Sequence, residues 1–283
     1  YNYVQVQQDG DGNRYLLLNE GEGVHSQWNA TNYEYGRTWD FFLAAPYFNA
    51  PPFTTSDVHG LAIIGLAGGT IARQYSHVYP TLPIDGIEID PGIIEAGKKY
   101  FGLDEMPNLN IYVEDGRYEL NKLNHKYTVV GIDAYRPPYI PFHLTTVEFF
   151  QQIRAHLEDD GAVVVNVGRT STDRRLVDAI TATLHEVFPS IYAMDVPNSF
   201  NTILVATVQQ TQAANLSANL AALPADTPQL LLDTLALANR TLVPVHSSDL
   251  VFTDDHAPVE SLVDSLVVNF LLSGGADQLR PEG

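Results

Sequence analysis

Four short segments place glycines or carboxylates directly after apolar runs, where such groups could contact a ligand. They contain the glycine-rich stretch 65–69, Glu88, Asp115 and Asp133. Short apolar runs with β-branched residues are typical of buried strands, and glycines let the backbone turn sharply and approach a ligand closely. Because ligands of parallel sheets bind beyond the carboxyl ends of the strands, we expect these four segments to form one site.

The glycines and Glu88 together favour a nucleoside as the ligand. Gly65, Gly68 and Gly69 separate a predicted strand from a predicted helix. Glu88 ends the next predicted strand about twenty residues later, where a carboxylate can accept both hydroxyl hydrogens of a ribose. A tight turn between two buried elements is the structural alternative for the glycines alone.

Asp115 and Gly116 follow the next strand of the predicted sheet, residues 110–113. The Asp115 carboxylate could accept a hydrogen from the amino group of adenine, and Gly116 would let the base lie against the backbone. Asp115 is equally suited to cap the helix that begins at Arg117. Both interpretations stay open from the sequence.

Asp133 follows a further apolar run, residues 127–132, so its carboxylate should emerge at the floor of the pocket. A pair with Arg136 that braces the following loop is the structural alternative. If Arg136 reaches Asp133, it lowers the pKa of that carboxylate and makes it a poorer proton acceptor.

The composition of the whole chain limits the classes of function. The chain has 283 residues, of which 45% are hydrophobic and 17% charged, as in globular proteins. A net charge of −19 argues against a nucleic-acid partner and favours a small cationic substrate, although the charge could serve solubility alone. The absence of cysteine excludes disulfides, thiolate metal sites and cysteine nucleophiles.

The sequence also indicates where the protein works. No apolar run approaches the roughly 20 residues that a membrane span requires. We therefore expect a cytoplasmic protein. The chain begins at Tyr1 rather than at methionine, which suggests a piece of a longer protein that could be tethered to a membrane.

Alternating strand and helix patterns predict an α/β protein with two domains. Residues 1–55 form a small antiparallel β-sheet domain with an Asp-Gly turn, and a joint is expected over residues 46–56. Residues 56–283 form a Rossmann-like, doubly wound sheet of the class I methyltransferase type, with helices at the C-terminal end. Strands are expected at 61–64, 84–89, 110–113, 127–132, 162–167, 191–194 and 202–208, the last two as an antiparallel hairpin.

These segments together resemble the spermidine synthase family, the polyamine aminopropyltransferases, over most of the chain. Glu88 in Ile-Glu-Ile-Asp, Asp115-Gly116 and Asp133 match the family's ribose-binding acid, its adenine-binding pair and its catalytic aspartate. Residues 140–146 and 253–260 further resemble a bacterial spermidine-synthase-like branch that is often fused to membrane-spanning segments.

The resemblance implies transfer of an aminopropyl group from decarboxylated S-adenosylmethionine to a small cationic amine, without a metal ion. Asp133 would assist the attack of the amine, and the glycine loop would contact the nucleoside. The family also implies a homodimer. The residues expected at the amine are Tyr135, Arg136, His143 and His25.

Departures from the family pattern keep other activities open. Ala67 replaces the loop aspartate that holds the donor's ammonium, and Arg136 replaces a second aspartate that helps to seat the diamine. His25 stands where a glutamine is expected. One alternative is a transferase that uses S-adenosylmethionine itself for methyl transfer. Another is a nucleoside-binding sensor without catalysis.

A second group of polar residues does not predict a metal site. His143, His256, Asp254, Asp255 and Glu260 fit no ligand spacing. His143 is either a pocket wall or a packed histidine. Asp254 or Asp255 is expected to cap a helix near Pro258.

Overall fold

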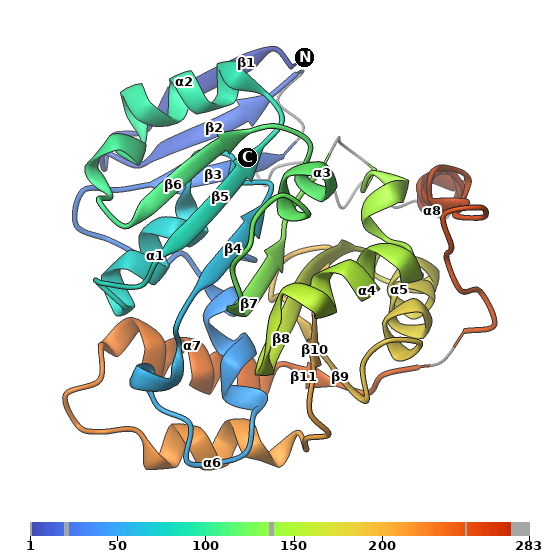
Figure 1. The fold of residues 1–283 in the computed structure, drawn as a ribbon. Helices are drawn as coiled ribbons and strands as arrows, with labels where there is room; N and C mark the ends of the chain where they lie inside the picture. The colour runs from blue at the N-terminus through green and yellow to red at the C-terminus, as the bar shows by residue number, and fades with distance from the viewer. Residues whose placement is uncertain (1, 20–22, 136–138, 247, 273–283) are drawn as a thin grey trace.

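The structure is a computed structural model that describes residues 2–19, 23–135, 139–246 and 248–272. Its centre is an eight-stranded sheet in the order β11-β9-β10-β8-β7-β4-β5-β6, and a separate three-stranded sheet has the order β1-β2-β3 (Figure 1). The central strands are β4 Leu61–Ile64, β5 Ile84–Glu88, β6 Leu109–Val113, β7 Tyr127–Ile132, β8 Leu157–Gly168, β9 Ser190–Asp195, β10 Asn201–Thr207 and β11 Leu242–Val243.

The strand directions confirm the predicted fold class. Strands β6, β5, β4, β7 and β8 pair in parallel, whereas β10 is antiparallel to both β8 and β9. The predicted terminal hairpin is therefore β9–β10. All the predicted strands are present, and β8 begins five residues earlier than expected because the chain enters the sheet directly after a helix ends at His156.

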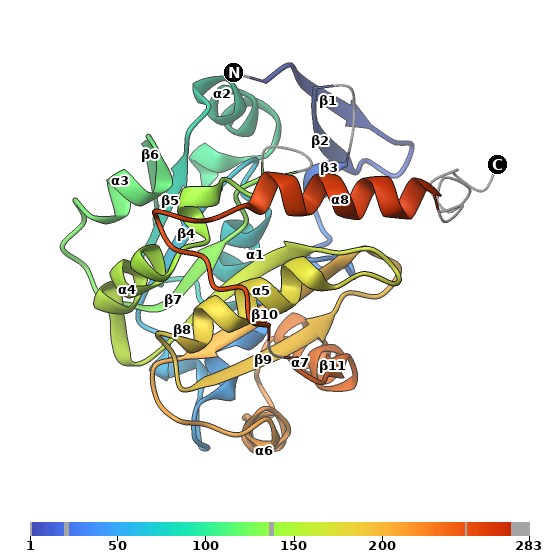
Figure 2. The ribbon, with the colours of Figure 1, turned by 90° about the vertical axis from the view of Figure 1, so that its right-hand side faces the viewer.

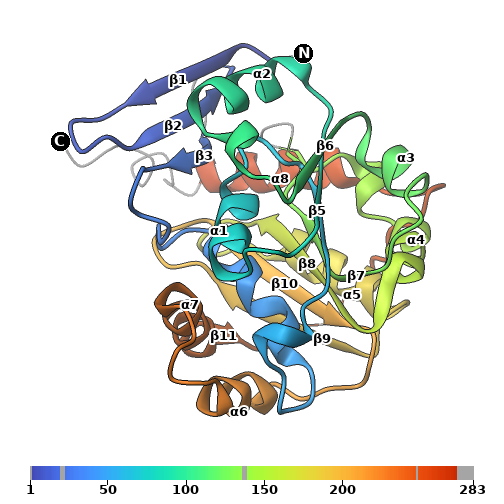
Figure 3. The same ribbon diagram turned by 60° about the vertical axis from the view of Figure 1, so that its left-hand side comes forward.

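Helices cover both faces of the central sheet, as the continuous apolar strands predict. Leu61 and Ile63 of β4 belong to one buried cluster, and Ala62 and Ile64 belong to the other, because successive side chains of a strand point to opposite faces. Figures 2 and 3 show helices on each side of the strands. The helices are α1 Thr70–Val78, α2 Pro91–Tyr100, α3 Gly116–Leu120, α4 Val147–His156, α5 Arg175–His185, α6 Ala214–Ala222, α7 Gln229–Arg240 and α8 Val259–Leu272.

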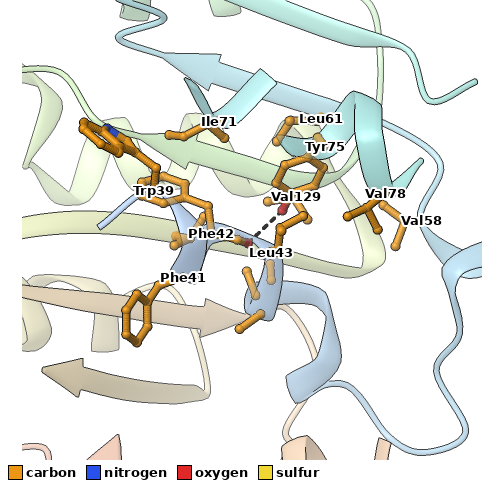
Figure 4. Packing of buried hydrophobic residues seen from close by; sticks show 14 of the residues in the cluster. Trp39, Phe41, Phe42, Leu43, Val58, Leu61, Ile71, Tyr75, Val78 and Val129 are labelled. Atoms are coloured by element: carbon orange, nitrogen blue, oxygen red, sulfur yellow. Dashed lines mark hydrogen bonds between the residues drawn. The ribbon is translucent and has the colours of Figure 1, made fainter. Parts of the chain in front are cut away.

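A buried 3₁₀ helix, η1 (Asp40–Phe48), lies between the sheet and helices α1, α6 and α7. All nine of its residues are buried, and the Tyr75 hydroxyl donates a 2.7 Å hydrogen bond to the carbonyl of Phe42 (Figure 4). Pro46, where the predicted joint begins, lies inside this helix. The division of the chain into domains 1–55 and 56–283 stays a prediction.

The small sheet consists of β1 Val4–Gln8, β2 Arg14–Leu18 and β3 Val24–Trp28 and is antiparallel, as predicted. Leu16 and Leu18 pack on Ile93 and Phe101 at helix α2 and its end, so the sheet is held against the main domain. Within the described residues, no helix combines the length and apolar character that a membrane span requires.

Candidate active site

The glycine loop between β4 and α1 brings two strand ends into close contact. Gly65 has φ +90°, and a Cβ built there would lie 2.5 Å from the backbone oxygen of Asp133, so only glycine fits. Gly69 also has positive φ and caps α1, and Gly68 donates its N–H to Ser26 Oγ at 2.7 Å. Strand β3 of the small sheet therefore helps to fix the loop.

Glu88 closes this loop from the neighbouring strand. Its Oε2 accepts the N–H of Ala67 at 3.0 Å, and its Oε1 accepts the N–H of Asp90 at 3.1 Å. Burial raises the pKa of Glu88 above its ordinary value. The carboxylate thus has a structural role in the loop and still lines a cavity, where its remaining lone pairs can meet a ligand.

Asp115 takes the capping role that the sequence left open. Its Oδ1 accepts the N–H of Tyr118 at 2.9 Å at the start of α3, and its Oδ2 lies 2.9 Å from His143 Nε2. A Cβ at Gly116 would lie 2.4 Å from Ile64 Cγ2, so this glycine permits α3 to pack on β4. His143 is also among the residues that line the cavity described next, so the structure agrees with a position in its wall.

The predicted strand-end residues line one cavity of about 540 Å³, named here the Glu88 cavity. It brings together Gly65, Glu88, Asp115, Gly116 and His143, whereas Gly68 and Gly69, which were also predicted to bind the nucleoside, are not among its described lining residues. The cavity is also lined by His25, Ala67, Asp133 and Tyr135, among others. No lysine or arginine side chain is among its described lining residues.

A second cavity of about 560 Å³, the Arg37 cavity, adjoins the first. The two share His25, Ala67, Asp133 and Tyr135. The second is otherwise lined by two loops, namely residues 35–39 before η1 and residues 196–199 between β9 and β10, together with Gly23, Val24, Asn166 and Asn201.

Asp133 lies where the two cavities meet and is oriented by a chain of amides. Asn166 Nδ2 donates to Asp133 Oδ1 at 2.8 Å, Asn201 Nδ2 donates to Asn166 Oδ1 at 2.8 Å, and Ser199 Oγ donates to Asn201 Oδ1 at 2.7 Å. Burial raises the pKa of Asp133 to about 7, although hydrogen bonds from Asn166 and Trp39 partly oppose this rise. A carboxylate with a pKa near neutrality can both accept and release a proton.

Asn166 was missed at the sequence level, although a signal for it was present. It is a polar residue near the carboxyl end of an apolar strand, β8, as Glu88 is in β5. Tyr135 donates its hydroxyl to the Asn166 carbonyl at 2.9 Å, so this predicted ligand residue also braces the site. Arg136, the predicted partner of Asp133, lies outside the described residues.

Asp254, one of the two residues predicted to cap a helix near Pro258, has other partners. Arg117 binds both carboxylate oxygens of Asp254, at 2.7 and 2.8 Å, and Thr146 Oγ1 donates to Oδ1 at 2.7 Å. The arginine fork is a stronger partner than a helix end, so the carboxylate ties α3 to α4. Within the part of the chain that the structure describes, no three histidine or acidic side chains are grouped so that they could hold a metal ion.

Known proteins resemble this chain in sequence. The family of spermine/spermidine synthase domains matches residues 49–219. A Bifidobacterium longum protein named "probable polyamine aminopropyl transferase" is 31% identical over 277 residues, which cover 93% of this chain. The aligned region spans 60% of the length of that relative.

Solved structures confirm the fold. A probable spermidine synthase from Corynebacterium glutamicum has a TM-score of 0.66 at 18% identity, covering 88% of this chain and 94% of its own. A spermidine synthase in complex with the transition state analogue AdoDATO has a TM-score of 0.53 at 20% identity, covering 84% and 86%. The family match extends over more than half of the chain and agrees with the motifs at Glu88, Asp115 and Asp133, so this protein belongs to the spermine/spermidine synthase family.

Proposed function

We propose that this chain transfers an aminopropyl group from decarboxylated S-adenosylmethionine to a small amine. The observation that carries the proposal is the position of Asp133 between two cavities, with its carboxylate held by Asn166 at 2.8 Å. A nucleoside in the Glu88 cavity would direct its sulfonium toward this junction, and an amine in the Arg37 cavity would approach from the other side. Family membership and the solved complex with AdoDATO support this arrangement.

In the proposed reaction the amine nitrogen attacks the aminopropyl methylene carbon that is bonded to the sulfonium sulfur. A C–N bond forms, the C–S bond breaks, and its electron pair stays on sulfur, which leaves as neutral methylthioadenosine. Before the attack, one proton of the arriving ammonium passes to Asp133 directly or through a water molecule, and after the attack the product nitrogen keeps its positive charge as an ammonium. General-base help of this kind typically contributes about 10²–10⁴ in rate.

The need for a base follows from the substrate. An alkylammonium has a pKa near ~10.4, like lysine, so almost all of the amine arrives protonated and cannot attack. Glu88 and Asp115 have carboxylate oxygens engaged in holding the loop and α3. Asp133 is therefore the carboxylate best placed to orient the amine and remove its proton.

Product analysis tests the proposal directly. The protein is incubated with decarboxylated S-adenosylmethionine and a panel of amines, and the products are identified by mass spectrometry. We expect methylthioadenosine together with an amine that has gained one aminopropyl group. Binding of the nucleoside without any product would instead support the sensor hypothesis and overturn the proposed reaction.

Methyl transfer from S-adenosylmethionine is the second candidate, and Ala67 is the observation that favours it. Ala67 lines both cavities at the loop position where the family has an aspartate for the donor's ammonium. An alanine there offers no countercharge to the decarboxylated donor and does not repel the carboxylate of the intact one. Release of S-adenosylhomocysteine rather than methylthioadenosine would identify this reaction.

A further inference from the structure

The charges of the Arg37 cavity differ from those expected for a diamine site. Among its described lining residues, the carboxylate of Asp133 and the guanidinium of Arg37 are the acidic and basic side chains apart from His25. Most of the other polar lining groups are amides and hydroxyls, including those of Thr38, Asn198 and Ser199. A cavity with one carboxylate and one guanidinium suits a ligand with one positive and one negative end.

Arg37 has no carboxylate partner among the described residues. Arg117, Arg174 and Arg175 all pair with aspartates, and Arg14, Arg73 and Arg154 donate hydrogen bonds to other oxygen atoms of the protein. An arginine fork at a cavity wall without an ion-pair partner is available for a ligand carboxylate, which it can bind through two parallel hydrogen bonds.

The backbone that carries Arg37 is fixed before any ligand arrives. The buried Asp40 accepts the N–H groups of Tyr35 at 3.0 Å and Gly36 at 2.6 Å, and its own N–H donates to the Arg37 carbonyl at 3.2 Å. Gln74 holds the other oxygen of Asp40 from helix α1. A preformed turn reduces the entropy that a ligand must spend to order its binding site.

We propose that Arg37 binds a ligand carboxylate and makes the Arg37 cavity selective for an amine that carries a negative end. This inference rests on the proposed function, which directs the reacting nitrogen toward Asp133. The second ammonium of a diamine would face the like charge of Arg37, whereas the carboxylate of an amino acid would form an ion pair there. Two reactants can bring this carboxylate: an amino-acid-like acceptor and intact S-adenosylmethionine.

Two sets of binding measurements test this inference, an acceptor arm and a donor arm. The acceptor arm compares three probes of equal chain length. Calorimetry in the presence of methylthioadenosine measures the binding of 4-aminobutyrate, 4-amino-1-butanol and 1,4-diaminobutane to the full chain. If the acceptor carries the carboxylate, 4-aminobutyrate should bind about tenfold or more tightly than the diamine. Arg37→Gln should remove that preference and leave 4-amino-1-butanol within twofold, because a charged hydrogen bond typically accounts for about ten- to a hundredfold in affinity.

The donor arm compares S-adenosylmethionine with its decarboxylated form, without methylthioadenosine. If the donor carries the carboxylate, Arg37→Gln should weaken S-adenosylmethionine about tenfold or more and leave the decarboxylated form unchanged. Arg37→Lys keeps the charge and should retain part of the affinity in whichever arm responds. Arg240→Gln is the matched control, because Arg240 is an exposed arginine that lines neither cavity.

The outcomes separate this inference from the proposed function. If Arg37→Gln changes both arms by no more than Arg240→Gln does, with equal melting temperatures, Arg37 does not bind a carboxylate. Tighter binding of the diamine than of 4-aminobutyrate, with no response in the donor arm, also overturns the inference. Absence of turnover with every amine contradicts only the proposed function, since both arms measure binding alone.

Discussion

The Glu88 cavity and the Arg37 cavity meet at Asp133 but are built from different kinds of backbone. The first is formed mainly by the ends of β4, β5, β6 and β7 and by the short turns that follow them. The second is formed largely by residues 35–39 and 196–199, which lie in loops. Strand ends are fixed by the sheet, whereas loops can change without disturbing it.

The two cavities also differ in charge. Glu88, Glu114 and Asp115 line the first without a lysine or arginine among its described residues, whereas both Arg37 and Asp133 line the second. The comparison predicts that changes at Asp133 affect the reaction, that changes in the Glu88 cavity affect nucleoside binding, and that changes near Asn166 affect the pH dependence.

The largest effect is expected from Asp133→Asn, which keeps the size of the side chain and removes its basicity. Turnover should fall at least about a hundredfold, because general-base help typically contributes 10²–10⁴. Because burial raises the pKa of Asp133, its ionised carboxylate lowers the free energy of unfolding at pH 8. The uncharged amide of Asp133→Asn should therefore not lower the melting temperature. Steady-state kinetics and thermal unfolding at pH 8 measure the two effects.

Asp249→Asn is the control for this variant, because it makes the same change of charge at an exposed site that lines neither cavity. Methylthioadenosine should bind both variants like the original protein. An Asp133→Asn protein that keeps its rate, or that loses stability while the control does not, would show that Asp133 is structural.

A smaller effect, on binding rather than rate, is expected from Glu88→Ala. A buried hydrogen bond to a charged group contributes roughly 1.5–3 kcal/mol, so methylthioadenosine should bind about ten- to a hundredfold more weakly. Calorimetry measures the change. Glu88→Gln should lose less affinity than Glu88→Ala, because its amide oxygen can still accept the N–H of Ala67, although its NH2 group cannot accept the N–H of Asp90.

Glu114→Ala is the matched control, since Glu114 lines the same cavity but has no predicted contact with the ribose. Equal losses of affinity in Glu88→Ala and Glu114→Ala would mean that general negative charge, and not a specific ribose contact, governs this cavity.

The same contrast explains what could be predicted from the sequence. The strand ends carrying Glu88, Asp115 and Asp133 were predictable, because apolar runs locate parallel strands and a parallel sheet aligns their carboxyl ends. The Arg37 cavity was not, because its residues come from loops far apart in the chain. Asp40 illustrates the limit: its role depends on Gln74, 34 positions away, and no local pattern links them.

The buried helix η1 escaped prediction for a related reason. Its run from Phe41 to Phe48 has no helical or alternating period, because every side chain in it is surrounded by protein. Pro46 inside it and Pro51 and Pro52 shortly after it are typical of a joint, and they dominated the local pattern. Its packing between the sheet and helices α6 and α7, which follow more than 160 residues later, explains why this segment is apolar on all sides.

The smallest effect is expected from Asn166→Ala, which removes a positioning residue and leaves Asp133 in place. With a pKa of about 7, Asp133 is ionised above neutrality. In a plot of log(kcat/KM) against pH, the slope should therefore decrease by one near pH 7, and this change of slope is called the break. Asn166 donates to the carboxylate and so favours its charged form. Without it the break should move to higher pH.

At pH 7 the rate of Asn166→Ala should therefore fall by up to about tenfold, since a shift of one pKa unit changes the ionised fraction by no more than tenfold. Near pH 9 Asp133 is ionised in the variant and in the original protein, so the two rates should be similar. Ser199→Ala serves as the control, because it removes a donor from the far end of the same chain of amides and should move the break less. A uniform loss of rate at every pH, with the break unmoved, would show that Asn166 acts on the shape of the Arg37 cavity and not through the proton affinity of Asp133.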